Sequence, residues 1–220
     1  MSDIDAKYSL TRDQVIFLAK RNLAEHIYNS AKLEGCNVSI VETQTILNGI
    51  NVEHIPIDVI QRILNLRRAW NYVLASFTDA FDLEYVCEIN TLVFRDEHLG
   101  GGKLRARKAK LPGTNFVPPI PVREDVDAEI LRIMNIESVT RRAITFFLWT
   151  CRARLFPDGN KRTGMFCANK MLIEAGAGIL TVKDALVPEF NKRLKQFFET
   201  GDMSVIDQWL YEHCIVGINL

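Results

Sequence analysis

The sequence lacks a net charge and a long apolar run. Its 27 basic and 27 acidic residues give a formal net charge of zero, so the overall composition gives no signal for nucleic acid or a membrane surface as partner. No run of about 18 apolar residues occurs, and the first residues are acidic without an apolar signal-like stretch. We therefore expect a cytoplasmic protein with no membrane-spanning segment.

The sequence also lacks cysteine pairs at CxxC spacing. The number of cysteines is odd, which disfavours a disulfide framework, and most of them fall in apolar helical runs. They are Cys36, Cys87, Cys151, Cys167 and Cys214. We expect buried free thiols in a reducing compartment, and neither disulfides nor a zinc site.

Apolar residues recur at helical spacing along most of the chain, and no repeat, linker or low-complexity tract divides it. This pattern predicts a single all-α domain over residues 1–220. A capping box of Thr11 and Gln14 begins a helix over 11–35, and residues 139–176 hold two core helices. The first core helix is apolar on nearly every side, which is typical of a central helix.

A polar loop lies between the two core helices. Asp158, Gly159 and Asn160 are turn-forming residues, with Gly159 suited to a positive φ. Lys161 and Arg162 then add two cations where the next helix exposes its unpaired N–H groups. Because cations are unfavourable at a helix N-terminus, an anion such as phosphate is the natural partner. The alternative is an ordinary solvated helix start.

Glu34 is misplaced at the end of the helix over 11–35. Ser30 and Glu34 continue its apolar stripe, and an acid in the last turn opposes the helix dipole. This placement suggests a cationic partner elsewhere in the fold. A frayed surface glutamate is the alternative.

Residues 100–122 break the helical pattern. Three glycines precede the basic segment 103–110, and a proline-rich stretch follows it. Turn residues between two short extended runs predict a β-hairpin or flap. The five positive charges of the basic segment would suit nucleic acid or an acidic target, although a short basic run in a neutral protein is more often a solvated edge.

The motif residues resemble the Fic (Fido) family, whose signature reads His-x-Phe-x-Asp/Glu-Gly-Asn-Gly/Lys-Arg. The matching positions are Phe156, Asp158, Gly159, Asn160, Lys161 and Arg162. The stretch from Gly102 to Arg105 before Pro118-Pro119 is similar to the family's flap. Ser30, Glu34 and Gly35 match its inhibitory motif, Ser/Thr-x-x-x-Glu-Gly/Asn.

The resemblance implies a helical Fic fold with a small β-hairpin flap, and transfer of AMP from ATP to a protein hydroxyl. In the family the motif His is the general base and the motif acid holds Mg²⁺, the role that would fall to Asp158. The nucleotide would be bound by the other matching positions, Phe156, Gly159, Asn160, Lys161 and Arg162. Cofactors would be ATP and Mg²⁺, and a target protein would dock at the flap, residues 100–122.

The sequence departs from the family pattern in its catalytic centre. Arg154 occupies the position of the His. Because an arginine side chain stays protonated up to about pH 12 or above, it cannot act as a general base. Leu155 replaces a proline, and Met165 replaces a second arginine that normally pairs with the inhibitory glutamate. Glu34 would therefore pair with Arg162, Lys161 or Arg154.

Other candidate bases are few. Of the four histidines only His26, on the helix over 11–35, is worth checking as a replacement, and we expect burial to raise the pKa of the Cys151 thiol. Lys161 in place of glycine resembles the Doc phosphotransferase toxins, which keep the His.

Three hypotheses follow. The first is a Fic enzyme of absent or attenuated activity that transfers AMP, or phosphate as Doc does. The second is a non-catalytic member that binds nucleotide or a protein and acts as a regulator. The third, nucleic-acid binding through the flap, has only the basic segment in its favour.

Overall fold

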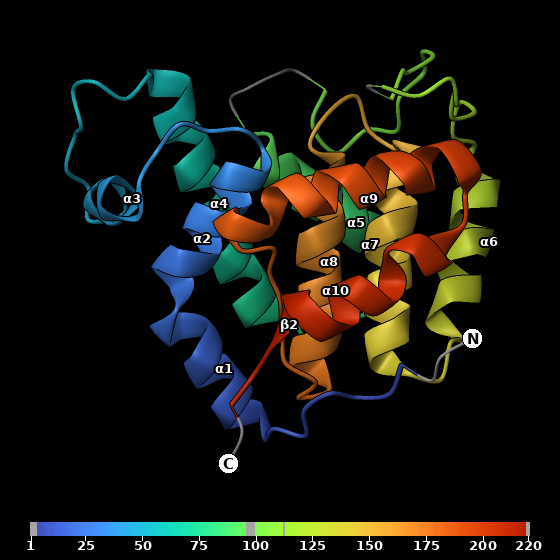
Figure 1. The fold of residues 1–220 in the computed structure, drawn as a ribbon, viewed down its shortest axis with the longest axis horizontal. Helices are drawn as coiled ribbons and strands as arrows, with labels where there is room; N and C mark the ends of the chain where they lie inside the picture. The colour runs from blue at the N-terminus through green and yellow to red at the C-terminus, as the bar shows by residue number, and fades with distance from the viewer. Residues whose placement is uncertain (1–3, 96–99, 112, 219–220) are drawn as a thin grey trace.

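The structure, a computed structural model, describes residues 4–95, 100–111 and 113–218. These residues are mostly helical, which confirms the all-α class (Figure 1). The α-helices are α1 (Arg12–Arg21), α2 (Leu23–Leu33), α3 (Ile40–Leu47), α4 (Ile57–Ser76), α5 (Leu83–Val93), α6 (Arg123–Met134), α7 (Val139–Ala153), α8 (Asn160–Glu174), α9 (Val187–Thr200) and α10 (Asp207–Cys214). Two 3₁₀ turns, η1 (Asp184–Leu186) and η2 (Met203–Val205), and two strands, β1 (Ile179–Leu180) and β2 (Ile215–Val216), complete the described elements.

Helices α7 and α8 form the centre of the molecule and pack more extensively on each other than on any other element (Figure 1). Gly164 allows this contact, because a Cβ there would lie 3.1 Å from Thr150 Cβ and 3.2 Å from the carbonyl oxygen of Phe147. Helix α8 is buried on all sides along most of its length. The loop between α7 and α8 is therefore held by two helices that the core fixes on every side.

The remaining helices surround this pair. Helices α9 and α10 cross in front of it, α1 to α4 lie on one side and α6 on the other (Figure 1). Strands β1 and β2 pair antiparallel, with Ile179 opposite Val216. The side-chain amide of Asn169 on α8 exchanges two hydrogen bonds with the backbone of Leu180, at 2.8 and 2.9 Å, and so ties this small sheet to the core.

The predicted helix over 11–35 is divided at Asn22 into α1 and α2. Its start is as expected, because Thr11 and Gln14 form the capping box. Asn22 has φ −103° and ψ 18°, outside helical values, although its N–H still reaches the carbonyl of Leu18 at 3.1 Å. The low helix propensity of asparagine favours a bend at this position. Past the bend, α2 packs mainly on α4 and α3 and buries Ser30, Ala31 and Leu33, while α1 packs on α8.

The described residues of the segment 100–122 form no strand, so the small antiparallel pair of this fold lies at β1 and β2 and not at the flap. Hydrogen bonds from the side chain of Arg105 take the place of the backbone hydrogen bonds expected in a β-hairpin. Its buried guanidinium donates to the carbonyls of Arg107 at 2.8 Å and Pro118 at 3.2 Å, and also to those of Pro119, Ala153 and Arg154. Prolines have no N–H with which to complete a ladder, so one arginine holds both arms of the flap against the end of α7.

Two further contacts fix the flap. The N–H of Arg105 donates to the carbonyl of Leu155 at 2.9 Å. Gly102 has a φ of 75°, and a Cβ there would lie 2.1 Å from the hydroxyl of Thr91. The flap is therefore joined to the loop after α7 by a backbone hydrogen bond, and it lies against α5 at a position where only glycine fits.

No helix within the described residues is long and apolar enough to span a membrane. This agrees with the short apolar runs of the sequence.

A buried histidine lies in the aromatic core. The ring of His26 packs on Trp70, with centroids 5.3 Å apart, and Trp70 packs edge-on against Phe166. Within the described residues, neither ring nitrogen of His26 has a hydrogen-bond partner. Burial lowers the pKa of His26 from 6.5 to about 4, because the charged form would lose its hydration.

This burial makes folding stability depend on pH. An unfolded His26 takes up a proton near pH 6.5 and the folded one only near pH 4, so the unfolded state gains stability as the pH falls through this window. We expect about 2 kcal/mol of unfolding free energy to be lost through His26 between pH 7.5 and 5. Urea denaturation of the native protein and of His26→Gln, at both pH values, measures the difference.

His213→Gln is the matched control, because this side chain is 49% exposed. Its pH dependence should equal that of the native protein. Equal pH dependence in the native protein and in His26→Gln would contradict the account of His26.

Candidate functional site

The loop between α7 and α8 turns through two left-handed backbone positions. Arg154 ends α7 with φ 50° and ψ 58°, and Gly159 precedes α8 with φ 73°, the positive value expected from the sequence. The amide of Asn160 closes the loop, since it accepts from the N–H of Phe156 at 2.9 Å and donates to the carbonyl of the same residue at 2.8 Å. Phe156 is fully buried and anchors the loop in the core.

Asn90 on α5 joins the loop to the flap, and the sequence analysis did not identify it. Its Nδ2 donates to the carbonyl of Asp158 and to the hydroxyl of Thr163, both at 3.0 Å, and its Oδ1 accepts from the N–H of Gly102 at 2.9 Å. The sequence does contain a signal for it, because Asn90 follows Val86 by one turn and so places a polar side chain on the apolar face of this helix. Buried polar groups of this kind need partners, and Asn90 satisfies its own across three segments.

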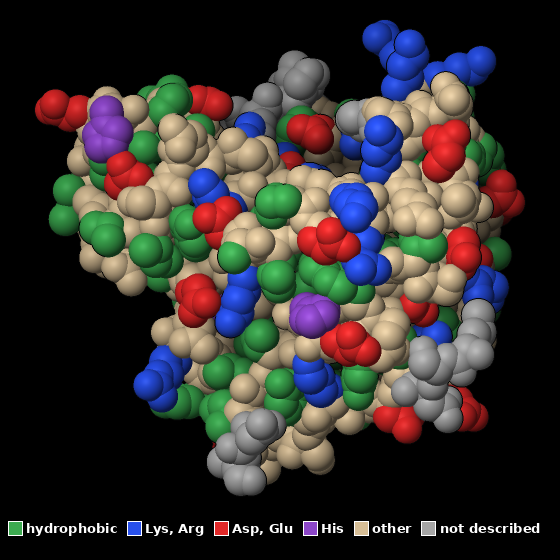
Figure 2. All heavy atoms as spheres, in the orientation of Figure 1, with side chains coloured by type: hydrophobic (Ala, Val, Ile, Leu, Met, Phe, Trp, Pro, Cys, Tyr) green, Lys and Arg blue, Asp and Glu red, His purple; other side chains and the backbone are tan. Residues whose placement is uncertain are grey.

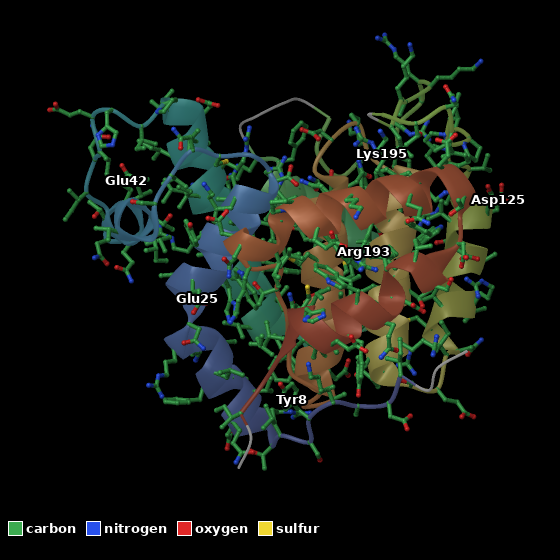
Figure 3. The ribbon with its side chains drawn as sticks, in the orientation of Figure 1. Tyr8, Glu25, Glu42, Asp125, Arg193 and Lys195 are labelled. Carbon is green, nitrogen blue, oxygen red and sulfur yellow. The ribbon has the colours of Figure 1, made fainter. Side chains whose placement is uncertain are left out.

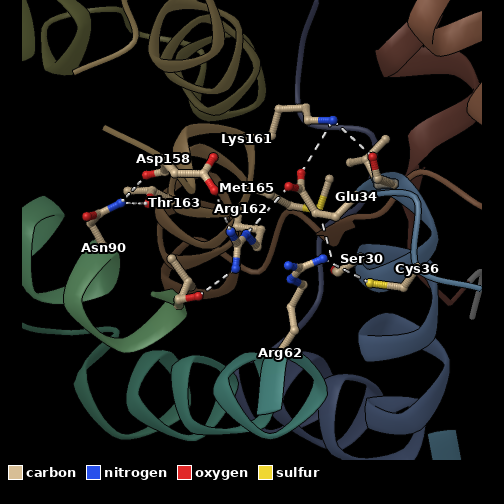
Figure 4. A network of polar contacts seen from close by, with 12 residues as sticks. Ser30, Glu34, Cys36, Arg62, Asn90, Asp158, Lys161, Arg162, Thr163 and Met165 are labelled. Carbon is tan, nitrogen blue, oxygen red and sulfur yellow. Dashed lines mark hydrogen bonds and ion pairs between the residues drawn. The ribbon is translucent and has the colours of Figure 1, made fainter. Parts of the chain in front are cut away.

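Glu34 lies at the start of α8, beside the two cations of the motif (Figure 4). Its Oε1 is 3.4 Å from Nζ of Lys161, and its Oε2 is 3.6 Å from Nε of Arg162. The Glu34 side chain is only 14% exposed. These are two of the three partners that the sequence offered, while Arg154 forms no ion pair with Glu34. The frayed surface glutamate is thereby excluded.

The contacts of this ion cluster are not equally strong. Lys161 also donates to the carbonyl of Leu33 at 2.9 Å, and Arg162 donates to the carbonyl of Val93 at 2.7 Å. Glu34 Oε1, in contrast, is buried and has no hydrogen-bond partner within the described residues. The cations are held by their own backbone contacts, so the carboxylate can leave without releasing them.

Ser30 lies one turn before Glu34 on α2, and Gly35 follows Glu34 directly. Gly35, with φ 78°, turns the chain back after α2, and its N–H donates to the carbonyl of Lys32 at 2.9 Å. The hydroxyl of Ser30 donates to the carbonyl of His26 at 2.8 Å and lies 3.8 Å from the sulfur of Met165. Met165 is buried, so the place of the family's second arginine is filled by an apolar side chain.

A pocket of about 390 Å³ opens beside Glu34. Cations from two helices line it, Lys161 of α8 and Lys195 of α9, together with Arg154 from the loop; Lys195 is labelled on α9 in Figure 3. Asp158, whose side chain is 54% exposed, contributes a carboxylate. The first N–H groups of α8 add the positive end of a 15-residue helix. The site can hold an anion with several oxygens.

Among the described residues that line the pocket, none is a histidine, and the one cysteine is held as a thiol. An arginine guanidinium keeps its proton at physiological pH, which applies to Arg154. Burial raises the pKa of Cys151, which also lines the pocket, to about 12, as expected. His26 does not line the pocket and lies against Trp70 instead. The candidates that the sequence offered in place of the motif His therefore cannot take a proton near neutral pH.

The residues of the pocket fit a magnesium–nucleotide complex. Mg²⁺ is typically held by one or two carboxylates together with phosphate oxygens and water. Asp158 supplies one exposed carboxylate, 3.6 Å from Nη2 of Arg162. The described part of the chain contains no group of three or more His, Cys, Asp or Glu residues that could hold a metal without a ligand. Any metal here would therefore be shared with phosphate.

Comparisons with known proteins agree with this geometry. Residues 80–172, which run from before α5 into α8, match the profile of the Fic/DOC family. No curated protein sequence matches the chain significantly.

Solved structures share the fold. Fic-1 from C. elegans matches with a TM-score of 0.77 and 18% identity over 89% of this chain and 62% of that one. A Fic domain-containing signaling protein from Bacteroides thetaiotaomicron has a TM-score of 0.74 and 15% identity over 92% and 86% of the two chains. A Fic family protein from Desulfovibrio desulfuricans has a TM-score of 0.70 and 16% identity over 89% and 62%.

Identities this low show a shared fold alone. The chain also spans less than two thirds of the C. elegans and Desulfovibrio structures. The family profile, in contrast, covers the loop and both core helices. Residues 80–172 therefore match the Fic/DOC family, within a fold that the chain shares with Fic proteins.

Proposed function

We propose that the pocket beside α8 binds the phosphates of ATP with Mg²⁺, and that the protein is a Fic-type AMP transferase of attenuated activity that Glu34 inhibits. The observation that supports this most directly is the Glu34 carboxylate between Lys161 and Arg162. A carboxylate in this position marks where two cations and a helix N-terminus stabilise an anion. A phosphate group offers the same donors more oxygen acceptors than a carboxylate does.

Each lining residue then has a role. Lys161 and the first N–H groups of α8 bind phosphate oxygens, and Lys195 adds charge from the opposite wall. Asp158 holds the Mg²⁺. When bound, the metal neutralises phosphate charge and orients the nucleotide. Glu34 occupies part of this space, so its departure precedes productive binding.

Transfer of AMP requires a proton acceptor. The oxygen of a target hydroxyl bonds to the α-phosphorus, the bond from that phosphorus to pyrophosphate breaks, and the hydroxyl proton must leave. Arg154 cannot accept this proton, and the Cys151 thiol is held protonated by its raised pKa. Loss of a general base typically costs about 10²- to 10⁴-fold in rate, so positioning and electrostatics alone would support slow transfer.

The same arginine supports a second candidate function, a non-catalytic regulator that binds nucleotide or a protein. A permanently charged side chain at the base position suits binding better than proton transfer. The transferase and a nucleotide-binding regulator would both bind ATP. Only the transferase would transfer a label from an ATP analogue to a target protein.

Removing the charge of Glu34 should strengthen nucleotide binding. We expect Glu34→Gln to bind ATP with Mg²⁺ about tenfold more tightly than the native protein, because the nucleotide no longer competes with two ion pairs. Isothermal titration calorimetry measures the affinity. Glu25→Gln, in the first turn of the same helix, is the matched control and should leave it unchanged.

Lys161→Ala should abolish the binding in either background. If neither the native protein nor Glu34→Gly binds ATP with Mg²⁺, the nucleotide site is contradicted and only a protein-binding role is left.

Restoring the base should restore transfer. Histidine tolerates the left-handed backbone of residue 154 better than most residues, so Arg154→His should fold without new strain. In the Glu34→Gly background we expect Arg154→His to transfer label from an ATP analogue to lysate proteins about 10²- to 10⁴-fold faster than Arg154 does. In-gel detection of the label over time measures the rate.

Arg154→Asn in the same background is the matched control, since asparagine also tolerates this backbone but cannot act as a base. It should show no gain. Label transfer absent from the native protein and from all these variants would contradict the transferase and favour the regulator.

A further inference from the structure

A second cavity, separate from the phosphate pocket, lies between the flap and the end of α7. It has a volume of about 440 Å³ and is lined by six cations together with small and apolar residues; the cations are Lys103, Arg105, Arg107, Lys108, Lys110 and Arg154. None of its lining residues is acidic or aromatic. Arg154 lines this cavity and the phosphate pocket, so the two meet at this residue.

The cations of this cavity have no acidic partner among the described residues. None of the six forms an ion pair with a residue that the structure describes, whereas ion pairs are frequent elsewhere on the surface. Four of the five flap cations are exposed, and the fifth, Arg105, is buried. Figure 2 shows Lys and Arg side chains grouped at the upper right, where Figure 1 draws the flap. The protein as a whole has no net charge, so this is a local surplus.

Arg154 extends this surplus of positive charge toward the interior of the protein. Its Nε is buried and has no hydrogen-bond partner within the described ranges. Its charge also adds to the burial that lowers the pKa of Arg105, so two guanidinium groups lie close enough to repel each other. A buried donor without an acceptor and an uncompensated pair of cations both favour an anion between the flap and the loop.

The backbone of the flap indicates what kind of anion. Over residues 106–110 no backbone N–H donates a hydrogen bond to any described residue, and this segment, which contains three cations, belongs to no helix or strand. An extended peptide complements unpaired main-chain groups of this kind. Nucleic acid would instead favour aromatic side chains for base stacking, and the cavity has none.

We propose that this cavity binds an acidic peptide segment of a partner protein, with carboxylates on the flap cations and one carboxylate on Arg154. The proposal deepens the proposed function by naming the chemistry of the partner, but peptide binding itself requires no nucleotide. Arg154 then serves as a receptor for an acidic side chain at the place where a general base would meet a hydroxyl.

Fluorescence anisotropy with labelled peptides tests the proposal on the full-length protein. The probes are a short alternating Glu-Ser peptide, a Gln-Ser peptide of the same length, and a single-stranded oligothymidylate of matched charge. We expect the Glu-Ser peptide to bind, the Gln-Ser peptide to bind at least about tenfold more weakly, and the affinity to fall between about 50 and 200 mM salt.

Two variants locate the site. The double variant Lys108→Glu/Lys110→Glu should weaken binding of the Glu-Ser peptide at least about tenfold, and Arg154→Gln should weaken it about three- to tenfold. The matched control is Lys20→Glu/Lys192→Glu, which changes the net charge equally at exposed positions on α1 and α9 and should bind as the native protein does.

The proposal is overturned by equal binding of the two peptides, by tighter binding of the oligonucleotide, or by a flap variant or Arg154→Gln that binds as the native protein does. Calorimetry with ATP separates it from the proposed function. Lys161→Ala should lose ATP and keep the peptide, while the flap double variant should lose the peptide and keep ATP.

Discussion

The charge cluster at the start of α8 is the constraint on which the site depends. Two cations stand where a helix already presents its positive end, and the carboxylate of Glu34, at the end of α2, pairs with both of them. The burial of α8 on nearly every side leaves these cations little room to move away. The fold therefore maintains an anion site that is filled, in this conformation, by its own glutamate.

The cluster also explains why distant segments meet here. Helix α2 ends at Leu33 and is followed by Glu34, which pairs with the cations of α8; Asn90 joins α5 to the loop, and Arg105 holds the flap against the end of α7. Asn90 and Arg105 satisfy backbone groups of other segments, and Glu34 pairs with side-chain cations of α8. Such joints fix relative positions without adding apolar area, which suits the rim of a binding site.

Much of this arrangement could be predicted from the sequence, because local chemistry determines it. The capping box at Thr11, the positive φ of Gly159 and the central apolar helix all follow from residue type and spacing. Glu34 was recognisable as misplaced, and its partners lay among the cations of the motif. The bend at Asn22 was missed because a continuous apolar stripe predicts one helix.

The flap was predicted less well. Its glycines and prolines predict a hairpin, but Arg105 bonds to carbonyls on both arms and takes the place of the ladder. No local pattern distinguishes this buried arginine from its exposed neighbours, because its partners lie up to 49 residues away. The role of Arg154 likewise could not be predicted from local sequence, since only the three-dimensional fold places it between two cavities.

The central claim is that Glu34 occupies the place of a phosphate group. A crystal structure of Glu34→Gly with ATP and Mg²⁺ tests it most directly. The account predicts a phosphate bound to Lys161 and the first N–H groups of α8, with Mg²⁺ on Asp158. A nucleotide bound elsewhere, or a pocket left empty at saturating ATP, would contradict it.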